Sequence, residues 1–288
     1  MTSSTTPTTA TTHPLAPLSA KEVKAATEIL TGSHRIADGS RFVSVSLQEP
    51  PKEEVLAWDD ATPPDREAFA VVYDRAGRQL HEAVVSLTRE VVVRCDPVPR
   101  ARPSYLLEEV FAVPEAVMAD PRWRTAMRRR GITDLSLTHI DPWPGAWLSE
   151  TDPGDRRVCR ALTWVRPPVE NGHPYARPVE GLMAVVDLDR MEVVDVYDHG
   201  VVRIPEFQGE YVPELITEAS ESNRPRFAGV RDDVQPIHIT QPDGPSWRVE
   251  GHRVTWQKWR LLVGWTAREG VVLFDIRYDD RGELRPVL

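Results

Sequence analysis

Cysteine is scarce in this sequence: Cys95 and Cys159 are the only two, and no Cys-x-x-Cys pair occurs. Two thiols so far apart make neither a disulfide framework nor a zinc site of the usual spacing. Both lie in apolar, strand-like segments, which predicts reduced cysteines in a packed core. Because nothing indicates disulfides, the expected location is the cytoplasm.

Long apolar runs and an excess of basic residues are also absent. No stretch of about 18 apolar residues exists that would cross a bilayer. Lys and Arg number 35 against 44 Asp and Glu, for a net charge of −9, so neither nucleic acid nor a membrane is an expected partner, while a cationic ligand would suit the acidic surface. Residues 1–13, mostly Thr and Ser, lack the pattern of a secretory signal and are expected to form a disordered tail.

Common catalytic signatures are missing as well. The sequence has no Gly-x-Gly-x-x-Gly, no phosphate loop, no Gly-x-Ser-x-Gly elbow and no His-Glu-x-x-His. The acidic clusters Asp187-Leu188-Asp189 and Asp232-Asp233 are expected at hairpin ends and in solvated loops. These absences exclude the enzyme classes that such motifs would indicate.

What the sequence does contain is a helix-then-strands pattern, first over residues 14–100. Ser19 followed by Glu22 is a capping box, and apolar residues then recur at helical spacing up to Gly32. A period of two follows, which predicts strands at 43–47, 69–74, 80–87 and 91–95. The middle two are expected to form a hairpin, and the Pro-rich, charged residues 50–64 to form a plain connection.

The same order returns over residues 101–205. Apolar spacing predicts a helix through Val117, with Pro114 at a helix start or kink, and a second helical stretch that stops at Gly131. Strands are expected at 135–140, 158–165, 182–188 and 193–197. The predicted fold class is therefore α+β, with two tandem small domains of a helix plus an antiparallel sheet. A short stretch of similar sequence in the hairpins of the two domains favours an origin by duplication of one domain.

After a linker at 206–233, residues 234–288 have only strand patterns. Strands are expected at 246–250, 254–262 and 271–278, followed by a hairpin turn at 279–282. About 55 residues of β-meander bury too little surface to stand alone. This segment is predicted to be the beginning of a larger, incomplete β-sandwich whose remainder is absent from the chain.

Several tracts carry a resemblance to a known family. They are His13-Pro14-Leu15 with its helix, Arg177-Pro178-Val179-Glu180-Gly181-Leu182 before a hairpin, Ile239-Thr240-Gln241-Pro242-Asp243-Gly244-Pro245-Ser246-Trp247, Val254-x-Trp256-x-x-Trp259, and Val263 through Leu273. In this order they resemble the amino-terminal accessory domains and the entry into the catalytic β-sandwich of copper/quinone amine oxidases. The likeness covers nearly all of residues 13–288. It implies cystatin-like folds for the two small domains.

The resemblance also implies an activity. Enzymes of that family oxidise primary amines to aldehydes and release ammonia and hydrogen peroxide from oxygen. They use copper held by three histidines, topaquinone made from a tyrosine in an Asn-Tyr-Asp/Glu-Tyr motif, and an aspartate as base. They are homodimers, mostly through the large β-sandwich. For the complete enzyme, primary amine and oxygen are thus the implied partners, and copper and topaquinone the implied cofactors.

The residues for that chemistry are not found in this sequence. Asn occurs only at Asn171 and Asn223, followed by Gly172 and Arg224, so the topaquinone motif is absent. No two histidines form the His-x-His pair that supplies copper ligands in the family; they stand at His13, His34, His81, His139, His173, His199, His238 and His252. A three-imidazole site needs converging side chains. The chain is expected to end before the catalytic aspartate, to hold no catalytic, cofactor or metal residue, and to be inactive alone.

Two residues are candidates for a narrower role. In the family the second accessory domain lends aromatic residues to the mouth of the amine channel, and Phe111 and Tyr175 stand at the corresponding places. Ordinary packing of Phe111 and a surface position for Tyr175 are the alternative. Four tryptophans of the last segment are expected to pack on the sheet, and two more to lie in a loop: Trp247, Trp256, Trp259 and Trp265, then Trp143 and Trp147.

Three functions remain open at this point. The chain can be a fragment of a primary-amine oxidase, a stand-alone non-catalytic binding module, or one half of a split oxidase. An unfinished sheet with exposed edges and tryptophans favours the fragment, because an evolved binding module would end cleanly near residue 210. The split version predicts a separate polypeptide that carries the Asn-Tyr motif.

Overall fold

The structure is a computed structural model that describes residues 13–59, 62–103, 105–145, 156–168, 172–206 and 233–287. Residues 1–12 of the predicted tail, most of the predicted linker, Trp147 and Asp232 lie outside these residues. The chain forms two compact units: one joins the chain up to Arg102 with the chain from Ile239 onward, and the other runs from Pro103 to His238. The predicted boundaries near residues 100 and 205 stay a prediction.

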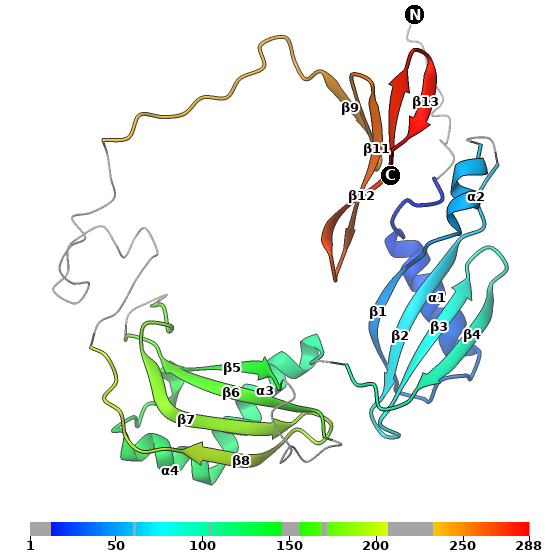
Figure 1. Ribbon diagram of the computed structural model, residues 1–288. Coiled ribbons are helices and arrows are strands. Elements are labelled where there is room, and N and C mark those ends of the chain that lie inside the picture. Colours follow the sequence, from blue (N-terminus) through cyan, green and yellow to red (C-terminus); the bar gives the residue numbers. More distant parts are fainter. Residues whose placement is uncertain are drawn as a thin grey trace, which may run out of the picture. The chain divides into compact units, whose positions relative to one another are not determined.

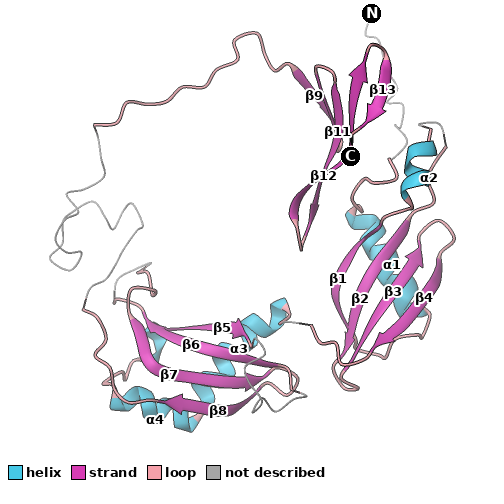
Figure 2. Ribbon diagram, in the orientation of Figure 1, coloured by secondary structure: helices cyan, strands magenta, loops and turns pink. Residues whose placement is uncertain are grey.

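The first unit begins with a helix on a four-stranded sheet (Figures 1 and 2). Helix α1 (Ala20–Gly32) starts at the capping box of Ser19 and Glu22, as predicted. Strands β1 (Arg41–Gln48), β2 (Glu67–Asp74), β3 (Gln79–Ser86) and β4 (Val91–Val98) pair antiparallel in the order β1-β2-β3-β4. The core is made of the helix face and the small residues of the central strands, namely Ala26, Leu30, Ala68, Ala70, Val72, Ala83 and Val85.

The connection 50–64 contains an element that the sequence analysis did not predict. Residues Lys52–Ala57 form a short helix, α2, after Pro51. The expectation of a plain connection was wrong there because proline is favoured just before and at the first turn of a helix. Val55 is the buried residue of α2. Its burial stabilises the helix, and the helix propensities of the individual residues do not reveal this contribution.

The second unit has the same plan with an additional helix. Helices α3 (Leu107–Ala119) and α4 (Pro121–Arg129) and a short 3₁₀ turn (Leu135–Leu137) precede β5 (Thr138–Pro144), β6 (Val158–Val165), β7 (Pro178–Asp187) and β8 (Glu192–Asp198). The strands again form an antiparallel sheet in sequence order. Pro114 lies inside α3 rather than at its start. Two helix-plus-sheet domains of the predicted α+β class are therefore confirmed.

The core of the second unit joins both helices to one face of this sheet. Its largest member is Trp123 of α4, which is fully buried and donates its indole N–H to the hydroxyl of Thr163 at 3.2 Å. Cys159 is also fully buried here, and burial raises the pKa of its thiol to about 12, so it is an inert core cysteine as predicted. Cys95 is free but only half-buried.

Residues 247–286 form a separate five-stranded antiparallel meander. Its strands are β9 (Trp247–Glu250), β10 (Arg253–Trp256), β11 (Trp259–Thr266), β12 (Gly270–Asp280) and β13 (Glu283–Pro286). The single strand predicted at 254–262 was wrong, because the chain reverses at Gln257-Lys258 to pair Trp256 with Trp259. Gln257 adopts a positive φ of 54°, although the sequence has no Gly or Asn there to indicate a turn.

One face of this meander is apolar and exposed. Directly opposed pairs such as Trp247–Trp256, Val249–Val254 and Trp265–Val271 share that face. Six of its side chains are between 42% and 69% exposed: Trp247, Val249, Trp256, Trp265, Val271 and Leu273. Of the four tryptophans predicted to pack, Trp259 packs its ring on Tyr278 at 4.8 Å. The prediction was wrong for the other three, because no second layer covers this face among the described residues.

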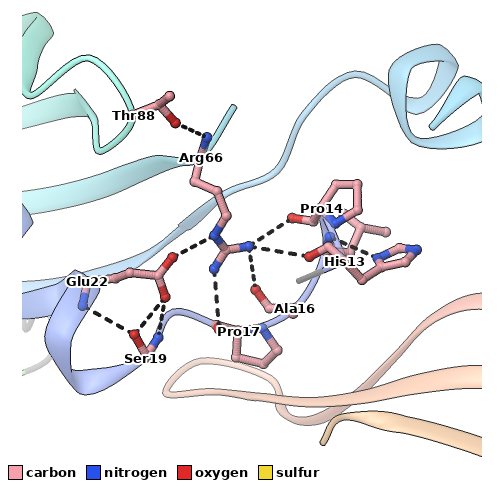
Figure 3. A network of polar contacts seen from close by, with 9 residues as sticks. His13, Pro14, Ala16, Pro17, Ser19, Glu22, Arg66 and Thr88 are labelled. Atoms are coloured by element: carbon pink, nitrogen blue, oxygen red, sulfur yellow. Dashed lines mark hydrogen bonds and ion pairs between the residues drawn. The ribbon is translucent and has the colours of Figure 1, made fainter. Parts of the chain in front are cut away.

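A buried arginine fixes the first described residues, from His13 to Pro17 (Figure 3). The Arg66 side chain donates to the backbone carbonyl oxygens of Ala16 at 3.0 Å and Pro14 at 3.2 Å, with longer contacts to those of His13 and Pro17. Its Nε donates to Glu22 at 2.7 Å, and Glu22 also accepts from Ser19. Because a guanidinium offers five donors in one plane, it can bind several carbonyl oxygens of an irregular segment at once.

Strands β11 and β12 of the meander contact this segment. His13 Nδ1 accepts from the amide of Leu15, so its proton lies on Nε2, which contacts Asp275 of β12 at 3.3 Å. Gly264 of β11 faces Pro17, and a Cβ at this glycine would lie 2.7 Å from the ring of Phe274 and 3.2 Å from Pro17. A side chain at residue 264 would push these surfaces apart, which explains the glycine.

Candidate functional site

Four polar and aromatic side chains gather on the helix-free face of the second sheet. Ile140 of β5 points into the core, so its neighbours His139 and Asp141 lie on the other face. Trp164 of β6 is directly opposite His139. Tyr175, in the loop before β7, reaches back to Asp141. We call His139, Asp141, Trp164 and Tyr175 the carboxylate–aromatic cluster.

Hydrogen bonds set the charge and the tautomer of this cluster. One Asp141 oxygen accepts from the Tyr175 hydroxyl at 2.7 Å, and the other contacts His139 Nε2 at 2.7 Å. The Arg166 guanidinium lies 3.3 Å from His139 Nδ1 and can only donate, so Nδ1 is the acceptor and Nε2 carries the proton. The neutral imidazole is thus held between an arginine and a carboxylate.

Aromatic edges surround the carboxylate. The Tyr175 ring makes T-shaped contacts with Trp164 at 5.2 Å, with His139 at 5.4 Å and with His173 at 4.9 Å between ring centroids. Tyr175 is 48% exposed, so the cluster is open to solvent. A carboxylate beside aromatic rings attracts an ammonium group by charge and by the ring quadrupoles. The arrangement can therefore hold an organic cation and orient it.

The two predicted channel residues have different surroundings. Tyr175 belongs to the carboxylate–aromatic cluster, whereas Phe111 lies on α3 and is 70% exposed. The buried residues Val113 and Val117 of that helix pack on the opposite face of the sheet. Among the described residues the structure records no contact between the Phe111 and Tyr175 rings, and their role at a channel mouth stays a prediction.

The sequence analysis missed His139, Asp141 and Trp164. The alternation His139-Ile140-Asp141 on a predicted strand indicates that the two polar residues share one face. This alternation could have predicted that His139 and Asp141 lie side by side. The approach of Tyr175 from a loop 34 residues beyond Asp141 has no local sequence signature.

The histidines do not converge elsewhere in the described part of the chain. All eight lie within the described ranges, and no group of three His, Cys, Asp or Glu side chains there could hold a metal ion. The residues present thus do not fit a three-histidine copper site. Within the same ranges no helix is both long and apolar enough to pass through a bilayer.

Comparison with known proteins places this chain in a family. Three family profiles match in chain order: "Copper amine oxidase, N2 domain" at residues 13–98, "Copper amine oxidase, N3 domain" at 108–211, and "Copper amine oxidase, enzyme domain" at 248–288. The chain belongs to the copper amine oxidase family. The resemblance noted in the sequence is thereby confirmed.

Curated relatives agree with this assignment. The chain is 36% identical over 277 residues to a primary amine oxidase of Arthrobacter sp. (strain P1), covering 96% of this chain and 40% of the relative. It is 35% identical to N-methylputrescine oxidase 1 of Nicotiana tabacum and 32% identical to histamine oxidase of Arthrobacter globiformis, with 96% of this chain and 39% of each relative covered. The chain therefore spans about two fifths of the length of these relatives.

A solved structure supports the fold. The copper-containing benzylamine oxidase from Hansenula polymorpha matches with a TM-score of 0.76 at 20% identity, over 94% of this chain and 43% of that one. A likeness at this identity concerns the arrangement of the backbone alone.

Proposed function

We propose that this chain is the amino-terminal portion of a copper- and topaquinone-dependent primary-amine oxidase. The whole enzyme would convert primary amines and oxygen to aldehyde, ammonia and hydrogen peroxide. The observation that carries this proposal is the succession of N2, N3 and enzyme-domain matches along one chain. Homodimerisation through the enzyme domain and a cytoplasmic location belong to the same proposal.

The copper and the quinone would be held by residues outside these 288. The sequence contains no Asn-Tyr pair, and its histidines do not converge in the described ranges. The quinone supplies the electron sink for amine oxidation, so no step of that reaction is assigned to residues of this chain. By itself, the chain is proposed to be inactive.

What this chain's own residues would contribute is amine binding. The carboxylate–aromatic cluster offers Asp141 and the ring of Tyr175 to an alkylammonium group before it reaches the reacting centre. His139 and Arg166 hold the Asp141 carboxylate in one orientation. A negative charge beside aromatic rings fits a cationic substrate and disfavours an anionic one.

The intact mass of the natural protein tests the proposal. The protein would be captured from its source cells with an antibody to residues 14–205, and a mass far above 32.5 kDa is expected. Hydrogen peroxide release with a primary amine and copper would then be measured for that product and for the 288-residue chain. A natural product near 32.5 kDa, or peroxide from the short chain, would contradict the fragment proposal.

A second candidate is favoured by the exposed apolar face of the meander. One half of a split oxidase would need such a face to bind the polypeptide that completes it. If the natural chain has a mass near 32.5 kDa, a copurifying second polypeptide with an Asn-Tyr motif would support this version.

A further inference from the structure

The second unit has a groove that is lined by the end of helix α4 and by the segment that follows strand β8. Its volume is about 710 Å³, and its apolar lining comes from Ile132, Leu137, Val165, Val201, Val202 and Ile204. A smaller hollow of about 100 Å³ adjoins it, because Ile132 and Thr133 line both. We call the two together the arginine groove, after the arginines that line them: Arg124, Arg128, Arg129, Arg130, Arg177 and Arg203.

Half of these arginines have a carboxylate partner. Arg129 and Arg130 both bind Asp198, and Arg203 binds Glu206. The other three, Arg124, Arg128 and Arg177, form no ion pair within the described ranges.

The remaining acid of the described lining does not offset this charge. Asp134 accepts hydrogen bonds from the amide and the hydroxyl of Ser136, and not from an arginine. In the described part of the second unit, six guanidinium groups of the groove thus face three carboxylates, those of Asp134, Asp198 and Glu206.

Acids of the adjoining strands face elsewhere. Glu180 of β7 is exposed on the helix-free face of the sheet, because its neighbour Val179 points into the core. Asp195 of β8 attracts Arg122, which does not line the groove. The excess positive charge of the arginine groove is therefore a local feature of a chain whose net charge is −9.

Two of the unpaired arginines repel each other on one helix. Arg124 and Arg128 are exposed and stand four residues apart on α4, a spacing that brings like charges together and destabilises a helix. Arg128 donates to the hydroxyl of Thr125 at 3.0 Å, which is a neutral acceptor. An anionic group bound between Arg124 and Arg128 would remove this repulsion.

We propose that the arginine groove binds an extended acidic peptide segment of another protein. Its carboxylates would pair with Arg124, Arg128 and Arg177, since a guanidinium offers paired N–H donors that match a carboxylate. Its apolar side chains would cover Val201 and Val202, which are 59% and 45% exposed. One extended peptide can present both kinds of side chain, because they alternate along its backbone.

The groove suits a peptide better than other anionic partners. Its volume is typical of pockets that hold small ligands, roughly 300–1,000 Å³, so a few peptide residues would fit. A nucleic acid would be repelled by the acidic remainder of the chain, and the described lining of the groove has no aromatic ring for a base to stack on. A membrane would need apolar side chains that project, whereas these line a hollow. The proposal goes beyond amine oxidation and does not depend on it.

Fluorescence anisotropy of the 288-residue chain tests the proposal with a labelled octapeptide of alternating Glu and Leu. Saturable binding that weakens with added salt is expected. Alternating Glu and Ser should bind at least about fivefold more weakly, because the apolar contact is lost, and alternating Lys and Leu should not bind. An absence of saturable binding, or equal binding of the Lys peptide, would overturn the proposal. Equally effective competition by single-stranded DNA or by phosphatidylserine vesicles would refute a peptide site.

Matched double variants locate the binding. Arg124→Gln/Arg128→Gln is expected to weaken the affinity at least about tenfold, because it removes two charge-assisted contacts. Arg156→Gln/Arg190→Gln changes the net charge equally at two exposed arginines of the same unit that do not line the groove, and should leave the affinity within about twofold. Equal affinities of the two variants would place the peptide elsewhere.

A measurement on the unaltered chain guards against misfolding of the variants. Saturating Glu/Leu peptide is expected to slow amide hydrogen exchange at Ile132, Thr133 and residues 201–204. Protection confined to the exposed apolar face of the meander, or no protection at these amides, would contradict binding in the arginine groove.

Discussion

At the scale of single residues, Arg157 is the most consequential buried charge. Its guanidinium donates to both oxygens of Glu109, at 3.0 and 2.8 Å, and to Asp189 at 2.9 Å. The side chains of all three are at most 4% exposed. Burial alone would lower the pKa of Arg157, but the hydrogen bonds that it donates to Glu109 and Asp189 raise this pKa. The ion pair therefore links the start of α3 to the turn between β7 and β8.

We expect Arg157→Leu to destabilise the second unit by about 3–5 kcal/mol, because it leaves Glu109 charged and buried without its partner. Urea unfolding followed by hydrogen exchange in β6 and β7 would measure the loss. Arg94→Leu is the matched control, since the Arg94–Asp96 pair is exposed and contributes less than about 1 kcal/mol. Similar losses of unfolding free energy in both variants would show that burial of the ion pair is not the cause.

Asp198 gives the protein a pH dependence of known sign. The hydrogen bond from Arg130 is the largest cause that lowers the pKa of Asp198 to about 2, from an ordinary value near 3.8. Since the folded pKa is the lower one, the stabilisation is complete above pH about 4 and is lost as the pH falls toward 2. Carboxyl NMR titration should show a midpoint near 2 that rises in Arg130→Gln. An unchanged midpoint would remove Arg130 as the cause.

At the scale of elements, the sequence predicted most strands because burial follows a period of two. Strand β6 alternates half-buried and buried residues over its whole length and was predicted with its observed bounds. The misses occurred where a non-local contact decided the structure. Helix α2 is held by the burial of Val55, and the reversal at Gln257-Lys258 by the pairing of Trp256 with Trp259, neither of which has a local signal.

The candidate site was predicted less completely for the same reason. Tyr175 was found through family resemblance, but its hydrogen bond to Asp141 joins a loop to a strand. The Arg66 network likewise joins residues that lie about 50 positions apart. Such contacts depend on the packed fold and cannot be derived from spacing along the chain.

Arg66 supports a prediction about the element that it holds. Arg66→Leu is expected to release residues 13–17, because the backbone carbonyls there lose their donors and Glu22 loses its charged partner. Hydrogen exchange should then accelerate at least about tenfold at Leu15 and Ala16 relative to helix α1. Arg89→Leu removes an exposed arginine beside the same sheet and should leave both amides unchanged.

At the scale of the whole molecule, the exposed apolar face of the meander is the surface at which we expect association. Tryptophans and aliphatic residues that are about half exposed form a contiguous patch of the kind that binds another surface. The 288-residue chain is therefore expected to self-associate at micromolar concentration. A soluble monomer over the whole range would count against the fragment proposal and favour a stand-alone module.

The double variant Trp256→Thr/Trp265→Thr should weaken this association at least about tenfold, since each exposed indole contributes apolar area to the contact. Sedimentation velocity would measure the dissociation constant. Trp143→Thr removes an equally exposed indole from the second unit and should leave it unchanged. An equal effect of both changes would show that the meander is not the associating surface.

The contact between His13 and Asp275 has a consequence for the order of events at the ribosome. His13 leaves the exit tunnel early, whereas its partner Asp275 is synthesised only after the whole second unit. The helices and strands of the second unit are contiguous in the chain and can pack as soon as they emerge. The second unit is thus expected to mature before the first, which waits for the strands of the meander to pack against its own beginning.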